Sequence, residues 1–201
     1  MKALKRILPI LGILAAGGLV SAGFGISKDL ASQLTSAAST GKVSQMIAIL
    51  DKGAPLDARD SGGKTPLGRA AYGGQLEAVT LLLDKGANVN VRGQYGKTPL
   101  MAAASRGHTD VVRLLLERGA EVNAEDWYGQ TPLICAALNG SKDVVALLLS
   151  KGADVNARTR KGFTALSLAT EQGHHHVVDL ILEKNPDQNV WPSQSSKARY
   201  R

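Results

Sequence analysis

Cysteine is nearly absent from this chain. Its 201 residues include a single thiol, Cys135, which excludes any disulfide framework within the chain. Cys135 lies in the apolar run at residues 133–137, and no neighbouring residue in the sequence offers a base that would activate it. We therefore expect a buried, inert thiol and no catalytic nucleophile at this position.

Aromatic residues are also scarce. They make up 4% of the chain, whereas hydrophobic residues as a group make up 44% and glycine occurs 22 times. A core of normal size must then be built from Leu, Val, Ile and Ala. Such a composition favours helices that approach each other closely through small side chains.

The middle of the chain lacks an excess of positive charge. The net charge of +7 comes mainly from the two ends, since Lys2, Lys5 and Arg6 precede the first acidic residue and three basic residues lie in 191–201. The remaining 18 basic residues stand against 17 acidic ones. Because binding to nucleic acid depends on a dense basic surface, we expect no nucleic acid partner.

The first 22 residues have the layout of a secretory signal peptide. A basic start is followed by the apolar run 7–16 and by small residues at 20–22, which predicts cleavage after Ala22. Residues 23–29 would then form a short N-terminal segment of a periplasmic or secreted protein, with no contact to the membrane after cleavage.

An uncleaved membrane anchor is the alternative for this segment. Residues 7–26 carry no charge, and their length is close to the roughly 20 residues that span a bilayer. Six or so glycine and proline residues dilute the run, and its most apolar part has the shorter length of a signal peptide. We therefore favour cleavage.

One pentapeptide frame recurs along the chain at a fixed spacing of 33 residues. The frame is Gly-x-Thr-x-Leu, and it begins at Gly63, Gly96, Gly129 and Gly162. A second set of glycines follows eleven residues after each frame glycine, and Gly-Ala pairs close each unit. A period of this length indicates stacked structural repeats.

Each unit predicts two short helices. The frame threonine is a helix N-cap, and the proline that follows it suits the first helical position. In the second helix Leu76, Val79 and Leu82 give one apolar stripe, and Gly86 suits a left-handed position beyond its end. Neither helix can bury its own stripe, so the units must stack as a solenoid.

These units resemble ankyrin repeats, with the best match to the family pattern at residues 96–124. The resemblance implies an all-α fold, a solenoid of about five helix-turn-helix repeats with β-hairpin-like loops. We expect the repeats at approximately 30–60, 61–93, 94–126, 127–159 and 160–187. The first and last would be caps, and the basic tail at 188–201 would be disordered.

The chain departs from the family pattern after the Thr-Pro-Leu segment. Ankyrin repeats often carry a histidine there that joins adjacent hairpins, but this chain has Gly68, Met101, Ile134 and Ser167. We expect those hydrogen bonds between repeats to be missing. Gly68 also weakens its helix, so we expect the repeat that contains it to be less rigid than its neighbours.

Other sequence motifs give weaker evidence of a function. The Gly-Lys-Thr triplets at 63–65 and 96–98 lack the earlier glycine of a phosphate-binding loop. The histidines at 174–176 are adjacent on a helix, where metal ligands would need a spacing of four, and His174 shares the position of His108 in the repeat, which favours a structural role for both. We expect no metal site, no cofactor and no enzymatic activity.

The resemblance places partner contacts on the hairpin tips and on the exposed, concave side of the first helices. All five aromatic residues of the repeats fall on such positions, as do several basic residues. The candidate partner-binding residues are Tyr72, Tyr95, Lys97, Arg106, Trp127, Tyr128, Arg160, Lys161 and Phe163. Aromatic and arginine side chains are common at binding hot spots. In the alternative interpretation, the rings pack only between adjacent hairpins.

The sequence therefore predicts a monomeric, non-catalytic scaffold in the periplasm that binds another protein through its concave face. A secreted effector directed at a host is the alternative function. The identity of the partner is not encoded in these features.

Overall fold

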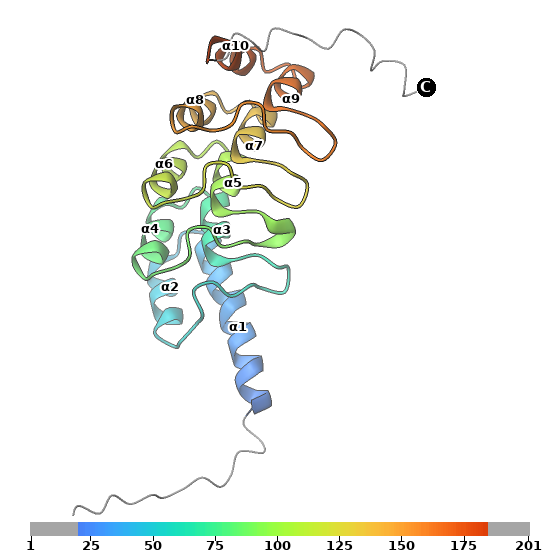
Figure 1. Ribbon diagram of the computed structural model, residues 1–201. Coiled ribbons are helices and arrows are strands. Elements are labelled where there is room, and N and C mark those ends of the chain that lie inside the picture. Colours follow the sequence, from blue (N-terminus) through green and yellow to red (C-terminus); the bar gives the residue numbers. More distant parts are fainter. Residues whose placement is uncertain (1–19, 185–201) are drawn as a thin grey trace, which may run out of the picture.

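The computed structural model describes residues 20–184, which form a stack of helix pairs with loops projecting to one side (Figure 1). The first helices of the pairs are α1 (Val20–Ser39), α3 (Pro66–Tyr72), α5 (Pro99–Ala104), α7 (Pro132–Leu138) and α9 (Ala165–Glu171). The second helices are α2 (Val43–Leu50), α4 (Leu76–Asp84), α6 (Thr109–Glu117), α8 (Lys142–Ser150) and α10 (His175–Lys184). A 3-10 turn, η1, covers Gln94–Gly96.

The helices form two layers. Each first helix contacts the first helix of the next pair, and the second helices stack on each other in the same way. We number the pairs as repeats 1 to 5 from α1 to α10 and call the contact between two neighbouring repeats a joint. The described residues contain no β-strand, which confirms the predicted all-α solenoid.

The start of each first helix follows the predicted capping chemistry. The side chains of Thr65, Thr98, Thr131 and Thr164 each accept a hydrogen bond from the backbone N–H three residues later. Proline follows the first three of these threonines, where its missing N–H costs no helical hydrogen bond. The framework that recurs every 33 residues therefore fixes where α3, α5, α7 and α9 begin.

One apolar core runs through all five repeats. Leu67, Leu100 and Leu133 are buried on the first helices, and aliphatic residues at equivalent positions of the second helices are buried beside them. Alanines such as Ala70 and Ala103 lie fully buried between adjacent first helices, where their small side chains allow close approach. No aromatic ring of the described side chains belongs to this core, as the composition indicated.

Hydrogen bonds between repeats are present, but they come from positions other than the one after Thr-Pro-Leu. The His108 Nε2 donates to the carbonyl of Tyr72 at 3.0 Å, and the His174 Nε2 donates to that of Leu138 at 3.1 Å. Asn90 and Asn123 also bridge repeats, each accepting from a backbone N–H of the next unit. The structural role expected for His108 and His174 is confirmed. The side chains at the position after Thr-Pro-Leu form no hydrogen bond between repeats, as predicted, and these other residues link the stack instead.

The first repeat begins earlier than its sequence pattern indicated. A single helix, α1, runs from Val20 to Ser39, so residues 23–29 are continuous with the repeat. Position 33 holds glutamine where repeats 2 to 4 have proline, and nothing there prevents the helix from extending towards the N-terminus. Most of the predicted signal peptide, residues 1–19, and the predicted tail from 188 onwards lie outside the described residues.

Candidate protein-binding face

The loops that project from the stack have a common backbone form. We call residues 59–64, 92–97, 125–130 and 158–163 fingers 1 to 4. In each finger one backbone N–H donates to a carbonyl four residues later: Asp60 to Lys64, Gly93 to Lys97, Asp126 to Gln130 and Thr159 to Phe163. These bonds give the hairpin-like shape that the resemblance implied, without the pairing of true strands.

Polar side chains hold three of the four fingers. The Oδ1 of Asp126 accepts hydrogen bonds from the backbone N–H groups of Tyr128 and Gln130, at 2.8 and 2.9 Å. Asp60 does the same in finger 1, and the Thr159 hydroxyl accepts from Phe163 in finger 4. These fingers are thereby fixed from within before any partner is present.

Finger 2 differs because Gly93 offers no side chain for this bond. Its tip instead forms the 3-10 turn η1, with Tyr95 in the left-handed region at φ 59° and ψ 21°. Tyr95 is the only non-glycine residue with positive φ in the described part of the chain. A bulky residue in this region is held there by its surroundings, at a cost of order 1–3 kcal/mol.

Adjacent fingers are joined through their aromatic residues. The Tyr95 ring meets the Trp127 ring edge to face, with centroids 6.2 Å apart, and lies 6.0 Å from the Tyr128 ring. The backbone adds to this, because the Trp127 N–H donates to the Tyr95 carbonyl at 3.0 Å and the Arg160 N–H donates to that of Tyr128 at 2.9 Å. The three rings form one cluster across fingers 2 and 3.

All five candidate rings remain exposed to solvent. Trp127 is 60% exposed and Tyr128 53%, and the exposed fractions of Tyr72, Tyr95 and Phe163 lie between 41 and 44%. Packing between hairpins therefore explains part of the cluster but leaves half or so of its surface free. An aromatic surface of this kind can bury a large area against a partner.

Tyr72 lies on the first helix of repeat 2 between two guanidinium groups. The Cζ of Arg106 is 5.0 Å from its ring centroid, and the Cζ of Arg69 is 6.0 Å away. Cation–π contacts of this length hold the ring and the two charges together at an exposed site. Arg106 was among the candidates from the sequence, whereas Arg69 was not.

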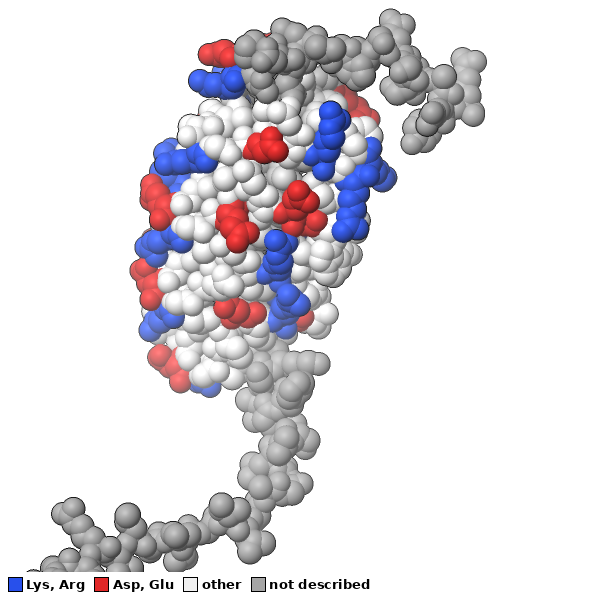
Figure 2. All heavy atoms as spheres, in the orientation of Figure 1, with Lys and Arg blue, Asp and Glu red and all other residues white. Residues whose placement is uncertain are grey.

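The cations of this face have no acidic partners. Among the described side chains, those of residues 29–184, the only ion pair joins Arg118 to Asp84 on the side of the second helices. Lysine and arginine side chains gather where the later fingers project, and the opposite edge alternates between basic and acidic residues (Figure 2). Lys97, Arg106, Arg160 and Lys161 are all exposed, and none of them forms an ion pair with a described side chain.

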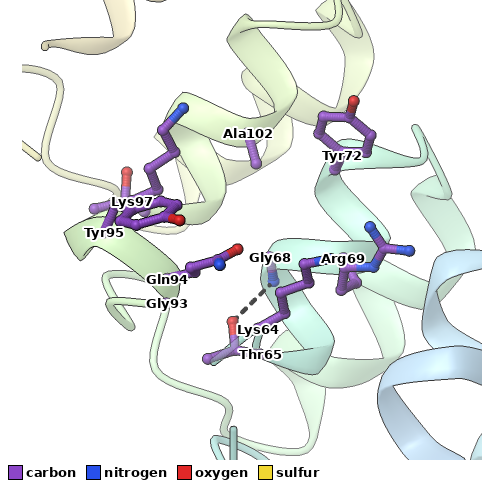
Figure 3. A pocket seen from close by; sticks show the side chains of 11 residues that line it. Lys64, Thr65, Gly68, Arg69, Tyr72, Gly93, Gln94, Tyr95, Lys97 and Ala102 are labelled. Atoms are coloured by element: carbon purple, nitrogen blue, oxygen red, sulfur yellow. Dashed lines mark hydrogen bonds between the residues drawn. The ribbon is translucent and has the colours of Figure 1, made fainter. Parts of the chain in front are cut away.

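A hollow of about 320 Å³ lies beside Tyr72 and Tyr95, between repeats 2 and 3 (Figure 3). In this view Tyr95 lies at one end with Lys97 beside it, Tyr72 lies at the other end with Arg69 nearby, and Lys64 lies between the two ends. The residues that line it are Lys64, Thr65, Gly68, Arg69, Tyr72, Gly93, Gln94, Tyr95, Lys97, Thr98 and Ala102. Three are cations and none is acidic.

Sequence reasoning brought the candidates to one side of the molecule but missed this hollow. Tyr72, Tyr95 and Lys97 line it, whereas Phe163 has no ring contact with the others and lies on finger 4. The sequence did contain a sign of the hollow, because Gly68 occupies the position at which the next two repeats carry Met101 and Ile134.

Cys135 is buried, as predicted. It is 2% exposed, and burial raises the pKa of its thiol to about 12, with a smaller opposing effect of Lys97 and a further increase from Asp126. A thiol of this kind is almost fully protonated at neutral pH, so it does not act as a nucleophile.

The described part of the chain contains neither a group of metal-ligating side chains nor a helix that could span a membrane. Among residues 20–184, no three His, Cys, Asp or Glu side chains lie close enough together to hold a metal ion. No helix in that range has the length and apolar character needed to span a bilayer.

Comparison with known proteins supports the architecture. A family model described as ankyrin repeats (3 copies) matches residues 19–93, 92–159 and 124–192, whereas no curated protein matches the chain. The match covers every helix pair described above, together with the capping threonines and the fingers. Ankyrin repeats generally mediate contacts between proteins and are typically non-catalytic. The chain therefore belongs to the ankyrin-repeat family.

Proposed function

We propose that this chain is a non-catalytic scaffold that binds a folded partner protein through its fingers and the adjoining surface of its first helices. The observation that carries the proposal is the arrangement of the rings. All five lie on this one side of the stack, each is at least 41% exposed, and none packs in the core.

The chemistry of the face supports contact with a protein. Tyr, Trp and Arg supply most of the binding energy at protein interfaces, because they bury much area with few rotatable bonds. The Tyr95, Trp127 and Tyr128 cluster is already assembled and its fingers are hydrogen-bonded, so little ordering is needed on binding. The cations around it favour a partner with an acidic surface.

A photo-crosslinking experiment tests the face directly. Benzoylphenylalanine would replace Tyr95 on finger 2 or, as a control, Leu76 on α4, which are 44% and 42% exposed. In cells that produce the full chain naturally, we expect a discrete crosslinked partner from position 95 and none from position 76. Equal crosslinking from both positions would contradict the proposed face.

A double substitution measures the contribution of the cluster. Trp127→Ala with Tyr128→Ala should weaken binding of the partner recovered by crosslinking by at least about tenfold, since hot-spot residues contribute about 2 kcal/mol or more each. Both side chains are more than half exposed, so circular dichroism should show an unchanged fold. Unchanged affinity would place the energetic centre elsewhere.

We also propose export to the periplasm with cleavage after Ala22. The support is the sequence of residues 1–22, with its basic start, apolar run and small residues at the cleavage position. N-terminal sequencing of the protein from separated cell fractions tests this, and we expect Gly23 as the first residue in the periplasmic fraction. An intact Met1 in the membrane fraction would contradict it, and recovery from the culture medium would favour the secreted effector.

A further inference from the structure

The hollow between repeats 2 and 3 results from two small residues in one register. At the joint between repeats 3 and 4, Met101 and Cys135 pack together with Ala124 and are at most 2% exposed. The residues 33 positions earlier are Gly68 and Ala102, and both line the hollow. The side-chain volume that closes one joint is therefore missing from the other.

The cations of the hollow form no ion pair with the described side chains. Lys64, Arg69 and Lys97 come from two repeats, and all three line this space. The carboxylate of Asp60 accepts hydrogen bonds from the backbone of finger 1 and offsets part of the positive charge near Lys64, but it does not line the hollow. Three unpaired cations in a concave, half-buried space attract an anion more strongly than they would on a flat surface.

The size and the lining limit what can enter. At about 320 Å³ the hollow is at the lower end of small-molecule sites, which leaves room for side chains of a partner but little for a cofactor. Tyr72 and Tyr95 offer apolar faces at its two ends, and Gln94 offers a polar group that can donate or accept hydrogen bonds. The lining thus combines cationic centres with aromatic ends.

We propose that this hollow receives an acidic segment of the partner protein, in which Asp or Glu side chains alternate with apolar ones. The carboxylates pair with Lys64, Arg69 and Lys97, and the apolar side chains pack on Tyr72 and Tyr95. This assignment rests on the proposed function and adds the chemical class of the segment that is recognised.

The test is a titration of the isotope-labelled full chain, followed by NMR, with a short capped peptide of alternating Glu and Leu. We expect saturable shifts of the backbone N–H signals of residues that line the hollow, including Gly68, Gly93 and Ala102. The same peptide with Gln in place of Glu should bind at least about tenfold more weakly, because the charge-assisted bonds are lost.

Two variants and a matched control locate the binding. Lys64→Glu with Lys97→Glu should weaken peptide binding by at least about tenfold, through lost attraction and new repulsion. Lys85→Glu with Lys151→Glu changes the net charge equally at exposed positions outside the hollow, and should change affinity by less than about twofold.

Gly68→Met closes the hollow without any change of charge. It gives repeat 2 the residue that repeat 3 carries at Met101. An added Cβ would lie 2.9 Å from the Thr65 hydroxyl oxygen, so this cap must shift towards the geometry of Thr98 and Met101, and circular dichroism should confirm that the fold is retained. We expect the Glu-Leu peptide to lose at least about tenfold in affinity for this variant. Wild-type affinity in Gly68→Met would overturn the assignment of the hollow.

Other outcomes would also overturn it: equal binding of the Gln-Leu peptide, shifts scattered over the outer helices, or tighter binding of inorganic phosphate or a single-stranded oligonucleotide at the same residues. Failure here is separable from failure of the proposed function. If a partner still crosslinks from position 95 but binds Gly68→Met with unchanged affinity, only the acidic-segment inference is contradicted. A peptide that binds the hollow when no partner crosslinks would sink only the scaffold proposal.

Discussion

Two joints of the same solenoid are packed differently: side chains fill one of them, and the other is left open. Between repeats 3 and 4, Met101 and Cys135 fill the space between the first helices, and Ser141 stands at the start of α8. Between repeats 2 and 3 the corresponding residues are Gly68, which has no side chain, and Ala102. At this joint His108 also bridges to the Tyr72 carbonyl.

The difference shows how a regular stack can vary locally. The capped helices and the leucine layers are the same at both joints, so they hold the repeats in place with or without the additional packing. The positions after Thr-Pro-Leu are then free to close a joint or to leave it open. A cavity can form on the binding face without loss of the stack.

The largest effect should follow from emptying the filled joint. Met101→Ala removes a fully buried side chain and leaves a cavity, which should lower the free energy of unfolding by about 2–5 kcal/mol. Urea unfolding of the full chain measures this. Met101→Leu, which keeps the volume, is the control and should cost less than about 1.5 kcal/mol. If Met101→Ala lowered the free energy of unfolding by less than about 1 kcal/mol, the two joints would be equally open.

A second test uses the thiol of the filled joint. Burial raises the pKa of the Cys135 thiol from its ordinary value of 9.0 to about 12, so the unfolded chain loses this proton first as the pH rises. Stability from the neutral thiol is then fully present below pH 9 and declines as the pH rises towards 12. Between pH 8 and 10.5 the free energy of unfolding of the wild type should fall by about 2 kcal/mol more than that of Cys135→Ala, as measured by urea unfolding.

The open joint provides the matched control for this thiol. In a variant with Cys135→Ala and Ala102→Cys, the thiol moves to a residue that lines the hollow and is partly exposed. The thiol is less desolvated there, so the free energy of unfolding should fall much less above pH 9 than it does in the wild type. Equal losses at the two positions would show that the hollow is as dry as the filled joint.

Much of this fold could be predicted because it depends on local chemistry. Thr65 and Pro66 specify a helix start wherever they occur, and the glycine after each second helix specifies a turn, so a period of 33 residues gives the stack directly. The exposed positions of Trp127 and Tyr95 also followed from the register, because framework positions were already assigned to the core.

What the pattern did not predict depends on contacts between repeats. Arg106 reaches the Tyr72 ring only because α3 and α5 pack side by side, and no spacing within one repeat encodes that contact, whereas Arg69 is three residues before Tyr72 on α3 itself. The hydrogen bond from His108 to Tyr72 spans 36 residues. Gly68 looked like a weak point in one helix, and its effect on the surface appears only beside Ala102 of the next repeat.

The smallest effect should come from the polar bridge at the open joint. His108→Ala removes the donor to the Tyr72 carbonyl, at a site that water can reach, and should cost about 1 kcal/mol. Ser141→Ala at the equivalent position of the filled joint removes no hydrogen bond between repeats, and should change stability by less than about 0.5 kcal/mol. Urea unfolding at one fixed pH compares the two directly. If both substitutions cost the same, the histidine contributes nothing specific to its joint, and the leucine and alanine layers alone hold repeats 2 and 3 together around the hollow.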